Sequence, residues 1–336
     1  MTTSDDLPLA VTMGDPAGCG PQITLRAWQT LSRDAGASPF YVIADPALFG
    51  DDGETIGCPA DAASVFASKL PVIPLSGSLP EFTTGTPDRA LAPAILQSID
   101  RAMADTFAGR ASAVVTNPIS KAVLYAAGFP HPGHTEYLAD LAHKQTGDVT
   151  PPVMMLVGGG LRVALATIHV PLMRVLDHLT APKLEHVIRT TARAMMRDFG
   201  INAPRIGLTG LNPHAGESGT IGLEERDIIN PVADRLSAEG IDVSPARPAD
   251  TIFAEMLDGR FDAIIAMTHD QGLIPVKTLD LWGGVNTTLG LPVIRTSPDH
   301  GTAYDAAAAN TARPDSLIAA ISLASKMAAQ RARHDR

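Results

Sequence analysis

The chain has 336 residues, of which 45% are apolar and 18% charged, a balance typical of folded proteins that excludes a disordered chain. Its net charge of −10 argues against a nucleic-acid surface, which needs clustered Lys and Arg. Cys19 and Cys58, the two cysteines, cannot build a disulfide framework or a cysteine-based zinc cluster. Residues 1–6 lack a signal-peptide pattern, and glycines and Arg162 interrupt the longest apolar stretch, 152–168. We therefore expect a cytoplasmic enzyme that contacts neither nucleic acid nor membrane.

Short β-rich runs alternate with helical patterns along the chain, which predicts an α/β fold with a largely parallel sheet and crossover helices. The predicted strands are 9–13, 40–44, 113–116, 153–157, 163–168, 206–209, 263–267 and 293–296. Helical periodicity predicts helices over 90–107, 181–198, 223–236 and 316–330. The segment 51–86 is rich in Gly, Pro and Ser, so we interpret it as peripheral loops and short elements. Two lobes are expected, 1–130 with 299–336 and 131–298.

Two glycine-rich segments are candidate turns. Gly14-Asp-Pro-Ala-Gly-Cys-Gly-Pro21 lies between a predicted strand and a helix. It is either a tight βα turn or a turn that presents backbone N–H groups to an anion. It has neither a Walker lysine nor the spacing of a dinucleotide fingerprint. Gly158-Gly-Gly160 leads into another strand, which predicts a hairpin turn.

Three histidines follow predicted strands, each within a short polar motif that we interpret as a turn. They are His169 in Thr167-Ile-His-Val-Pro171, His214 in Asn212-Pro-His-Ala-Gly216 and His269 in Thr268-His-Asp-Gln-Gly272. Carboxyl ends of parallel strands line the ligand crevice of α/β sheets, so three imidazoles could meet there. Three neutral nitrogens would leave an open position on a Zn²⁺-like ion, as in a catalytic metal site. For any single histidine, a core or surface role is the commoner explanation.

A second group of candidate residues is polar or cationic. Lys277, Asn286 and Arg295 lie in the carboxyl-terminal third of the chain. Arg295 ends an apolar strand, so it should meet either a bound anion or an internal partner such as Asp299 or Asp305.

Two further segments offer candidates near predicted helix starts. Gly133-His-Thr-Glu136 should open a helix, with Thr135 as its cap. Asp250 should be a helix cap or a carboxylate that orients a ligand.

Taken together, these segments resemble the 4-hydroxythreonine-4-phosphate dehydrogenase (PdxA) family of pyridoxal phosphate biosynthesis over nearly the whole chain. The motifs that carry the resemblance, in chain order, are Thr12-Met-Gly-Asp-Pro-Ala-Gly18, Thr116-Asn-Pro118 with Lys121, Gly133-His-Thr-Glu136, Leu211-Asn-Pro-His-Ala-Gly-Glu217, Pro248-Ala-Asp250, His269-Asp-Gln271, Gly284-Val-Asn286, Gly290-Leu-Pro-Val-Ile-Arg-Thr-Ser297 and Asp299-His-Gly-Thr302. Several motifs in this order are far more specific than any one of them.

The resemblance implies a two-lobed fold like that of isocitrate and isopropylmalate dehydrogenases, with the active site between the lobes. It implies one divalent metal ion (Zn, Mg or Co) held by His169, His214 and His269 across a homodimer interface. The implied substrate contacts are His134, Thr135, Lys277, Asn286 and Arg295. Of the same residues, His134 and Lys277, together with Asp250, are the candidates for catalysis. NAD or NADP would bind without a Rossmann fingerprint.

The implied reaction oxidises 4-phosphooxy-L-threonine and releases CO₂ to give 3-amino-2-oxopropyl phosphate. Two departures from the family pattern matter: Thr268 replaces the usual Tyr, and Cys19 and Gln22 replace an aliphatic residue and Glu. Thr268 leaves open a related dehydrogenase that acts on a four-carbon sugar-acid phosphate or a dihydrodiol dicarboxylate. A three-histidine metal hydrolase is the alternative from another class.

Overall fold

The computed structural model describes residues 7–148 and 150–336; the amino-terminal segment discussed above, 1–6, lies outside them. The chain forms two compact units. Unit 1 comprises the residues up to Pro152 together with Leu291–Ala332, and unit 2 comprises Val153–Gly290 with Arg333–Arg336. Within the described ranges, no helix combines the length and apolarity needed to cross a membrane.

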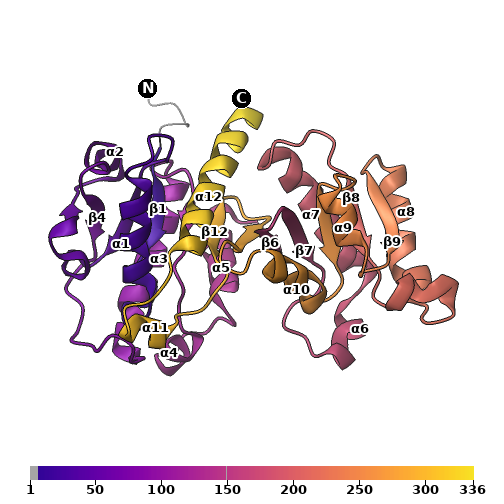
Figure 1. The fold of residues 1–336 in the computed structure, drawn as a ribbon, viewed down its shortest axis with the longest axis horizontal. Helices are drawn as coiled ribbons and strands as arrows, with labels where there is room; N and C mark the ends of the chain where they lie inside the picture. The colour runs from indigo at the N-terminus through magenta and orange to yellow at the C-terminus, as the bar shows by residue number, and fades with distance from the viewer. Residues whose placement is uncertain (1–6, 149) are drawn as a thin grey trace. The chain divides into compact units, whose positions relative to one another are not determined.

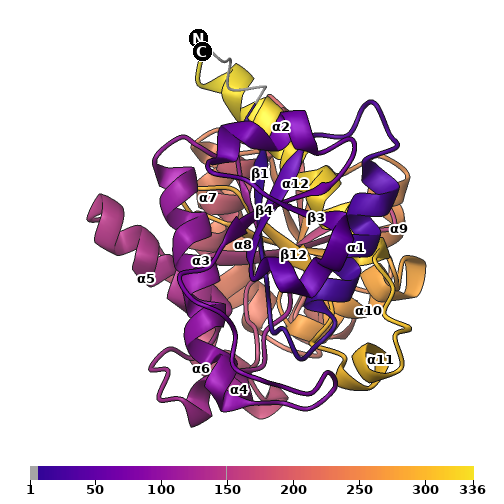
Figure 2. The same ribbon diagram turned by 90° about the vertical axis from the view of Figure 1, so that its left-hand side faces the viewer.

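Unit 1 is built on parallel strands in the order β3-β4-β2-β1-β5-β12. Its strands are β1 (Leu9–Thr12), β2 (Phe40–Ala44), β3 (Gly53–Thr55), β4 (Leu70–Pro74), β5 (Val114–Val115) and β12 (Arg295–Pro298). Its helices are α1 (Gly20–Leu31), α2 (Ala62–Val65), α3 (Ala92–Phe107), α4 (Lys121–Ala126), α5 (His134–Thr146) and α11 (Tyr304–Ala308), and α12 (Asp315–His334) begins in it. Short 3₁₀ turns cover Pro46–Asp52, Pro59–Asp61 and Arg89–Leu91. Figure 2 shows α1 and α3 on opposite sides of these strands, as a buried parallel sheet requires.

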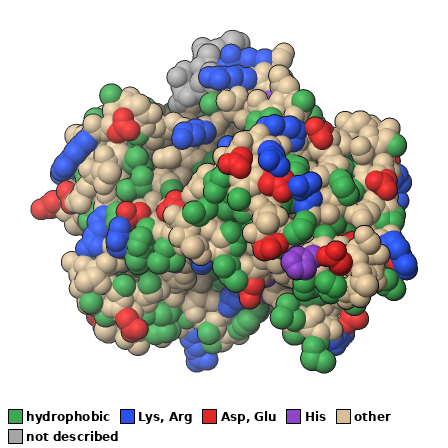
Figure 3. Space-filling model, turned by 45° about the vertical axis from the view of Figure 1, so that its right-hand side comes forward, with side chains coloured by type: hydrophobic (Ala, Val, Ile, Leu, Met, Phe, Trp, Pro, Cys, Tyr) green, Lys and Arg blue, Asp and Glu red, His purple; other side chains and the backbone are tan. Residues whose placement is uncertain are grey.

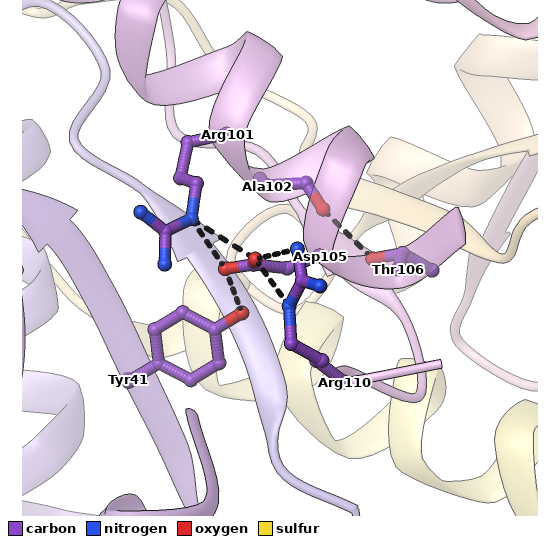
Figure 4. Close-up of polar contacts among 6 residues, drawn as sticks. All are labelled: Tyr41, Arg101, Ala102, Asp105, Thr106 and Arg110. Atoms are coloured by element: carbon purple, nitrogen blue, oxygen red, sulfur yellow. Dashed lines mark hydrogen bonds and ion pairs between the residues drawn. The ribbon is translucent and has the colours of Figure 1, made fainter. Parts of the chain in front are cut away.

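A buried carboxylate joins α3 to β2 in unit 1 (Figure 4). The Asp105 side chain is fully buried and accepts hydrogen bonds from the Tyr41 hydroxyl at 2.9 Å and from the Nε atoms of Arg101 and Arg110 at 2.9 and 3.0 Å. Burial and the Asp105 charge raise the pKa of Tyr41 far above its usual value. Because both arginines are partly exposed, they neutralise the carboxylate while their outer nitrogens reach solvent.

Unit 2 holds strands in the order β11-β6-β7-β10-β8-β9. They are β6 (Val153–Gly158), β7 (Leu161–Leu165), β8 (Ile206–Thr209), β9 (Val243–Arg247), β10 (Ala263–Ala266) and β11 (Val285–Leu289). The pairs β11/β6 and β6/β7 are antiparallel and the others are parallel. Gly159 and Gly160 have left-handed backbones between β6 and β7, which confirms the predicted hairpin.

Helices pack on both faces of the unit 2 strands, because successive strand residues point to opposite sides. Ala164 and Ile265 belong to a core cluster that includes Leu184 of α7 and Val232 of α8. Val163 and Ile264, their chain neighbours, belong to a second cluster with residues of α9 and α10. The helices and turns, labelled in part in Figure 1, are a 3₁₀ turn (Leu172–Arg174), α6 (Val175–His178), α7 (Ala181–Arg197), η6 (Pro213–Gly219), a π-helical turn (Glu225–Ile229), α8 (Asn230–Ala238), α9 (Ile252–Leu257) and α10 (His269–Leu279).

The boundaries between the units differ from the predicted ones. Residues 131–152 belong to unit 1 rather than to the second lobe, because α5 packs on α3 and the Tyr137 hydroxyl bonds to Asp100. Residues 291–298 also belong to unit 1, because β12 pairs with β5. The prediction of a mostly parallel α/β fold is confirmed, and 51–86, interpreted as loops and short elements, contains the short strands β3 and β4.

Candidate functional site

Arg295 of unit 1 is a buried cation whose guanidinium contacts the Thr116 hydroxyl. It lies at the start of β12 and is only 4% exposed. Its Nε and Nη2 donate to the hydroxyl of Thr116, the residue after the neighbouring strand β5, at 3.0 and 2.7 Å. Burial lowers the pKa of Arg295 to about 10, and the nearby Glu136 carboxylate opposes that shift. A desolvated guanidinium of this kind favours an anionic group beside it.

His134 lies in the same electrostatic environment, at the first residue of α5. Burial, and then the charge of Arg295, lowers the pKa of His134 well below its usual value of 6.5. The imidazole is therefore neutral at physiological pH. Its Nε2 atom is shielded from solvent and, among the described residues, has no hydrogen-bond partner. An unpaired polar atom beside a buried cation is what a site for an anionic, hydrogen-bonding ligand presents.

The other residues predicted near this helix start have different roles from those expected. The residue before α5 is Gly133, and no side chain caps the helix, so the prediction that Thr135 caps it is wrong. A Cβ added at Gly133 would lie 2.7 Å from the Glu136 carboxylate and 3.4 Å from Lys121 Nζ. Glycine at this position therefore lets the Lys121 and Glu136 side chains approach the helix start.

The glycine-rich turn after β1 is closed by its own contacts. The N–H groups of Ala17 and Gly18 donate to Asp15, and that of Cys19 donates to the Thr302 carbonyl. Asp15 also accepts from the Tyr304 hydroxyl at 2.6 Å. Because these amides already have partners, the tight-turn interpretation of 14–21 is favoured over an anion cradle.

In unit 2, two of the predicted metal-binding histidines lie side by side. The ring centroids of His169, after β7, and His269, after β10, are 5.6 Å apart. Two imidazoles on one tetrahedral Zn²⁺, each at a metal–nitrogen distance of about 2.0–2.1 Å, have ring centres roughly 5 Å apart. His269 Nδ1 lies 2.8 Å from the Asp270 carboxylate, a contact that keeps the proton on Nδ1 and presents Nε2 as the ligand atom. The pair therefore fits a divalent ion.

His214 occupies a left-handed turn after β8. The residues His214 to Ser218 all have φ between 44° and 77°, a conformation that non-glycine residues rarely adopt. His169 has a φ of 49° as well. Such strained backbone clusters at functional sites. Within residues 7–148 and 150–336, however, no three His, Cys, Asp or Glu side chains of one chain are arranged to hold a metal.

The remaining candidates are spread over unit 2. Lys277 lies in α10 and Asn286 in β11. Asp250 is exposed in the turn before α9, whose N-cap is Thr251, so the helix-cap alternative for Asp250 is wrong. His269 begins α10 rather than a turn, because Thr268 and Gln271 form a capping box there.

Four residues that contact or act on the candidate residues were given no role from sequence: Thr116, Glu136 and Gln271, which lie within the quoted motifs, and Glu225. Only Thr268-His-Asp-Gln271 carried a readable signal, the capping-box spacing of Thr and Gln before a helix. The others act through contacts between segments distant in the chain.

Two α/β units with mostly parallel strands and polar residues at strand ends define a mixed α/β protein with an enzyme-like site. The model of the family described as "Pyridoxal phosphate biosynthetic protein PdxA" matches residues 37–324. The 4-hydroxythreonine-4-phosphate dehydrogenase of Methylorubrum populi is 51% identical over 334 residues, which cover 97% of this chain and 95% of that protein. The chain therefore belongs to the PdxA family.

Solved structures agree with this assignment. The crystal structure of 4-hydroxythreonine-4-phosphate dehydrogenase from Klebsiella pneumoniae has a TM-score of 0.84 at 35% identity, covering 96% of this chain and 99% of that one. A terephthalate 1,2-cis-dihydrodiol dehydrogenase from Burkholderia xenovorans has a TM-score of 0.65 at 28% identity, covering 95% and 98%.

Proposed function

We propose that the chain is a 4-hydroxythreonine-4-phosphate dehydrogenase of vitamin B6 biosynthesis that acts in the cytoplasm. It oxidises 4-phosphooxy-L-threonine with NAD⁺ or NADP⁺, and the resulting β-keto acid loses CO₂ to give 3-amino-2-oxopropyl phosphate. The observation that carries the proposal is the close pair of imidazoles, His169 and His269, at the ends of two strands. The curated relatives of the same length bear the same activity in their names.

The histidines would hold one divalent ion, Zn, Mg or Co, with His214 as the third ligand. When bound, the ion supplies Lewis acidity toward the substrate hydroxyl, and the nicotinamide supplies the oxidising power. The spacing of the His169 and His269 rings supports a shared ion, and the Asp270 carboxylate beside His269 Nδ1 would fix the tautomer of that ligand.

Arg295 and His134 would bind the anionic end of the substrate. The buried guanidinium supplies the charge, and the neutral imidazole supplies a hydrogen-bonding Nε2. His134 would then either contact the phosphate or carry a proton. Thr135, Lys277 and Asn286 would complete the substrate contacts and fix its orientation, and Asp250 would orient a ligand.

A homodimer would complete the metal site, with a second copy contributing ligands. Large apolar side chains follow the histidines and are exposed: Leu172 (78%) and Met173 (96%) after His169, and Ile274 (64%) after His269. Exposed apolar groups at such a site favour burial against a partner. On the face that Figure 3 shows, hydrophobic, acidic and basic side chains are interspersed. Met173→Glu should shift the chain toward a monomer in analytical ultracentrifugation; an unchanged sedimentation coefficient would contradict this interface.

The variant His214→Ala tests the assignment. We expect it to stay folded by circular dichroism while metal-dependent production of reduced nicotinamide from 4-phosphooxy-L-threonine falls to background. The matched control is His186→Ala on α7, which should keep the wild-type rate. Full turnover by His214→Ala would overturn the assignment of the histidines.

A related substrate is the second candidate, favoured by the likeness to the terephthalate dihydrodiol dehydrogenase and by Thr268 in place of the usual Tyr. Side-by-side kcat/KM values for 4-phosphooxy-L-threonine and a dihydrodiol dicarboxylate would decide between them. Ester cleavage without nicotinamide would instead indicate the metal hydrolase.

A further inference from the structure

The peptide group between Gly210 and Leu211 is held from both sides by buried or half-buried polar side chains. Gln271 Nε2 donates to the Gly210 carbonyl at 2.9 Å. Glu225 Oε1 accepts from the Leu211 N–H at 2.8 Å. The carbonyl of this peptide is thus bound by a side chain of α10, and its N–H is bound by a side chain of the π-helical turn Glu225–Ile229.

Glu225 also shapes the left-handed turn that carries His214. It is 3% exposed, and it accepts from the Asn212 N–H at 2.8 Å and from Asn212 Nδ2 at 2.9 Å. Successive N–H groups aimed at one carboxylate form an anion-binding nest. A Cβ added at Gly216 would lie 2.6 Å from Glu225 Oε2, so the turn wraps closely around the carboxylate. Strained backbone of this kind persists only where surrounding contacts determine it.

Gln271 connects the same strand end to the start of α10. Its Oε1 accepts from the Thr268 N–H at 3.0 Å and lies 3.3 Å from the Thr209 hydroxyl. Gln271 therefore binds both the residue before His269 and the peptide that leads into the His214 turn. Its two amide ends tie the two histidine segments together within unit 2.

We infer that Glu225 and Gln271 are positioning residues that set where His214 lies relative to His269, through the shared Gly210–Leu211 peptide. The inference rests on the proposed metal site. Neither side chain has to touch the ion or the substrate; each acts by fixing backbone. Loss of either contact lets the left-handed turn relax and moves a ligand away from the position that the ion needs.

Cobalt binding tests this without relying on turnover. The full-length chain, freed of metal by chelation, is titrated with Co²⁺ while the visible absorption of the bound ion is recorded. Glu225→Gln and Gln271→Met should each weaken Co²⁺ binding by about tenfold or more, the range typical of residues that orient metal ligands. Their spectra should change as well. Glu224→Gln is the matched control, since Glu224 contacts the Asn212 side chain but not the Gly210–Leu211 peptide, and it should change affinity less than about twofold.

The double variant separates positioning from general loosening. Because both side chains act through one peptide, the double variant should bind Co²⁺ more tightly than the product of the two single effects predicts. Wild-type affinity in either folded single variant, strictly multiplicative effects, or an equal loss in Glu224→Gln would overturn the inference. If Glu225→Gln does not fold, Gln271→Met, which leaves the carboxylate in place, still decides it. Failure of the wild-type chain to bind Co²⁺, or binding that survives His214→Ala, would instead overturn the proposed metal site on which the inference rests.

Discussion

Two buried carboxylates, one in each unit, are held in different ways. Asp105 in unit 1 is neutralised by two arginines and a tyrosine (Figure 4). Glu225 in unit 2 is held by backbone N–H groups and an asparagine amide. The partners of Asp105 belong to a helix, a strand and the loop after the helix, whereas those of Glu225 are two successive residues, Leu211 and Asn212, just before the left-handed turn. The first arrangement stabilises the fold, and the second dictates the path of a loop.

Arg295 is another buried charge, and one of its hydrogen-bond partners is the neutral Thr116 hydroxyl. Opposite charges satisfy each other and leave little field for a ligand, while neutral donors and acceptors orient a charge without cancelling it. The Asp105 cluster is thus neutralised by opposite charges, whereas Glu225 is held by neutral donors.

The largest expected effect is on Asp105. Asp105→Ala should lower the free energy of unfolding by roughly 3 kcal/mol, because the buried Tyr41 hydroxyl loses its acceptor and two guanidinium groups lose their carboxylate. Urea denaturation measures this change. Co²⁺ affinity should stay at the wild-type value. Asp227→Ala, which removes only an exposed pair with Arg226, is the control and should leave stability nearly unchanged. Loss of Co²⁺ binding in a folded Asp105→Ala chain would contradict the conclusion that Asp105 stabilises the fold without affecting the metal site.

His134 differs from both carboxylates because protonating it would place a second positive charge near Arg295 in a desolvated position. Its folded-state pKa lies below the ordinary 6.5, so below that pH the unfolded chain binds the additional proton. Stability is then fully present above about pH 6.5 and falls on acidification, by at most about 1.4 kcal/mol per pH unit from this one group. His134→Gln should flatten the decline between about pH 6.5 and 5, as measured by urea midpoints at each pH. Identical slopes in the two chains would show that His134 protonates freely in the folded state.

Tyr41→Phe is the smallest expected change. It removes one hydrogen bond to Asp105 while both arginines remain, so unfolding should become easier by about 1 kcal/mol. Thermal denaturation measures this shift, and Tyr125→Phe, at an exposed tyrosine, is the control. A loss as large as that of Asp105→Ala would mean that the hydroxyl, and not the arginines, holds the carboxylate.

The elements that sequence predicted well are the ones whose signal is local. Strands such as β2 and β10 are continuous apolar runs. α7 begins where Thr180 accepts from the Lys183 N–H, as its capping pattern indicates. β4 (Leu70–Pro74) contains two prolines, and β9 (Val243–Arg247) contains one and several polar residues. No strand was predicted at either segment, because proline normally disfavours a strand.

The candidate site divides in the same way. Strand-end positions predicted that His169, His214 and His269 would meet; the rings of His169 and His269 lie side by side, and the place of His214 beside them stays a prediction. Nothing in the sequence around Leu211 or Glu225 shows that a carboxylate thirteen or fourteen residues downstream binds the turn, since that contact exists only once β8 and the π-helical turn have packed. The left-handed backbone of His214 is equally invisible, because such φ values are imposed by tertiary contacts.

The most direct test of the whole account uses the chelator-stripped wild-type chain with 4-phosphooxy-L-threonine and NAD⁺ or NADP⁺. The measurement is the rate of reduced-nicotinamide formation, together with released CO₂, before and after a divalent ion is restored. The account predicts no turnover without the ion and matched formation of both products with it. Equal turnover in its absence, or no turnover with Zn²⁺, Mg²⁺ or Co²⁺ and either nicotinamide, would contradict it.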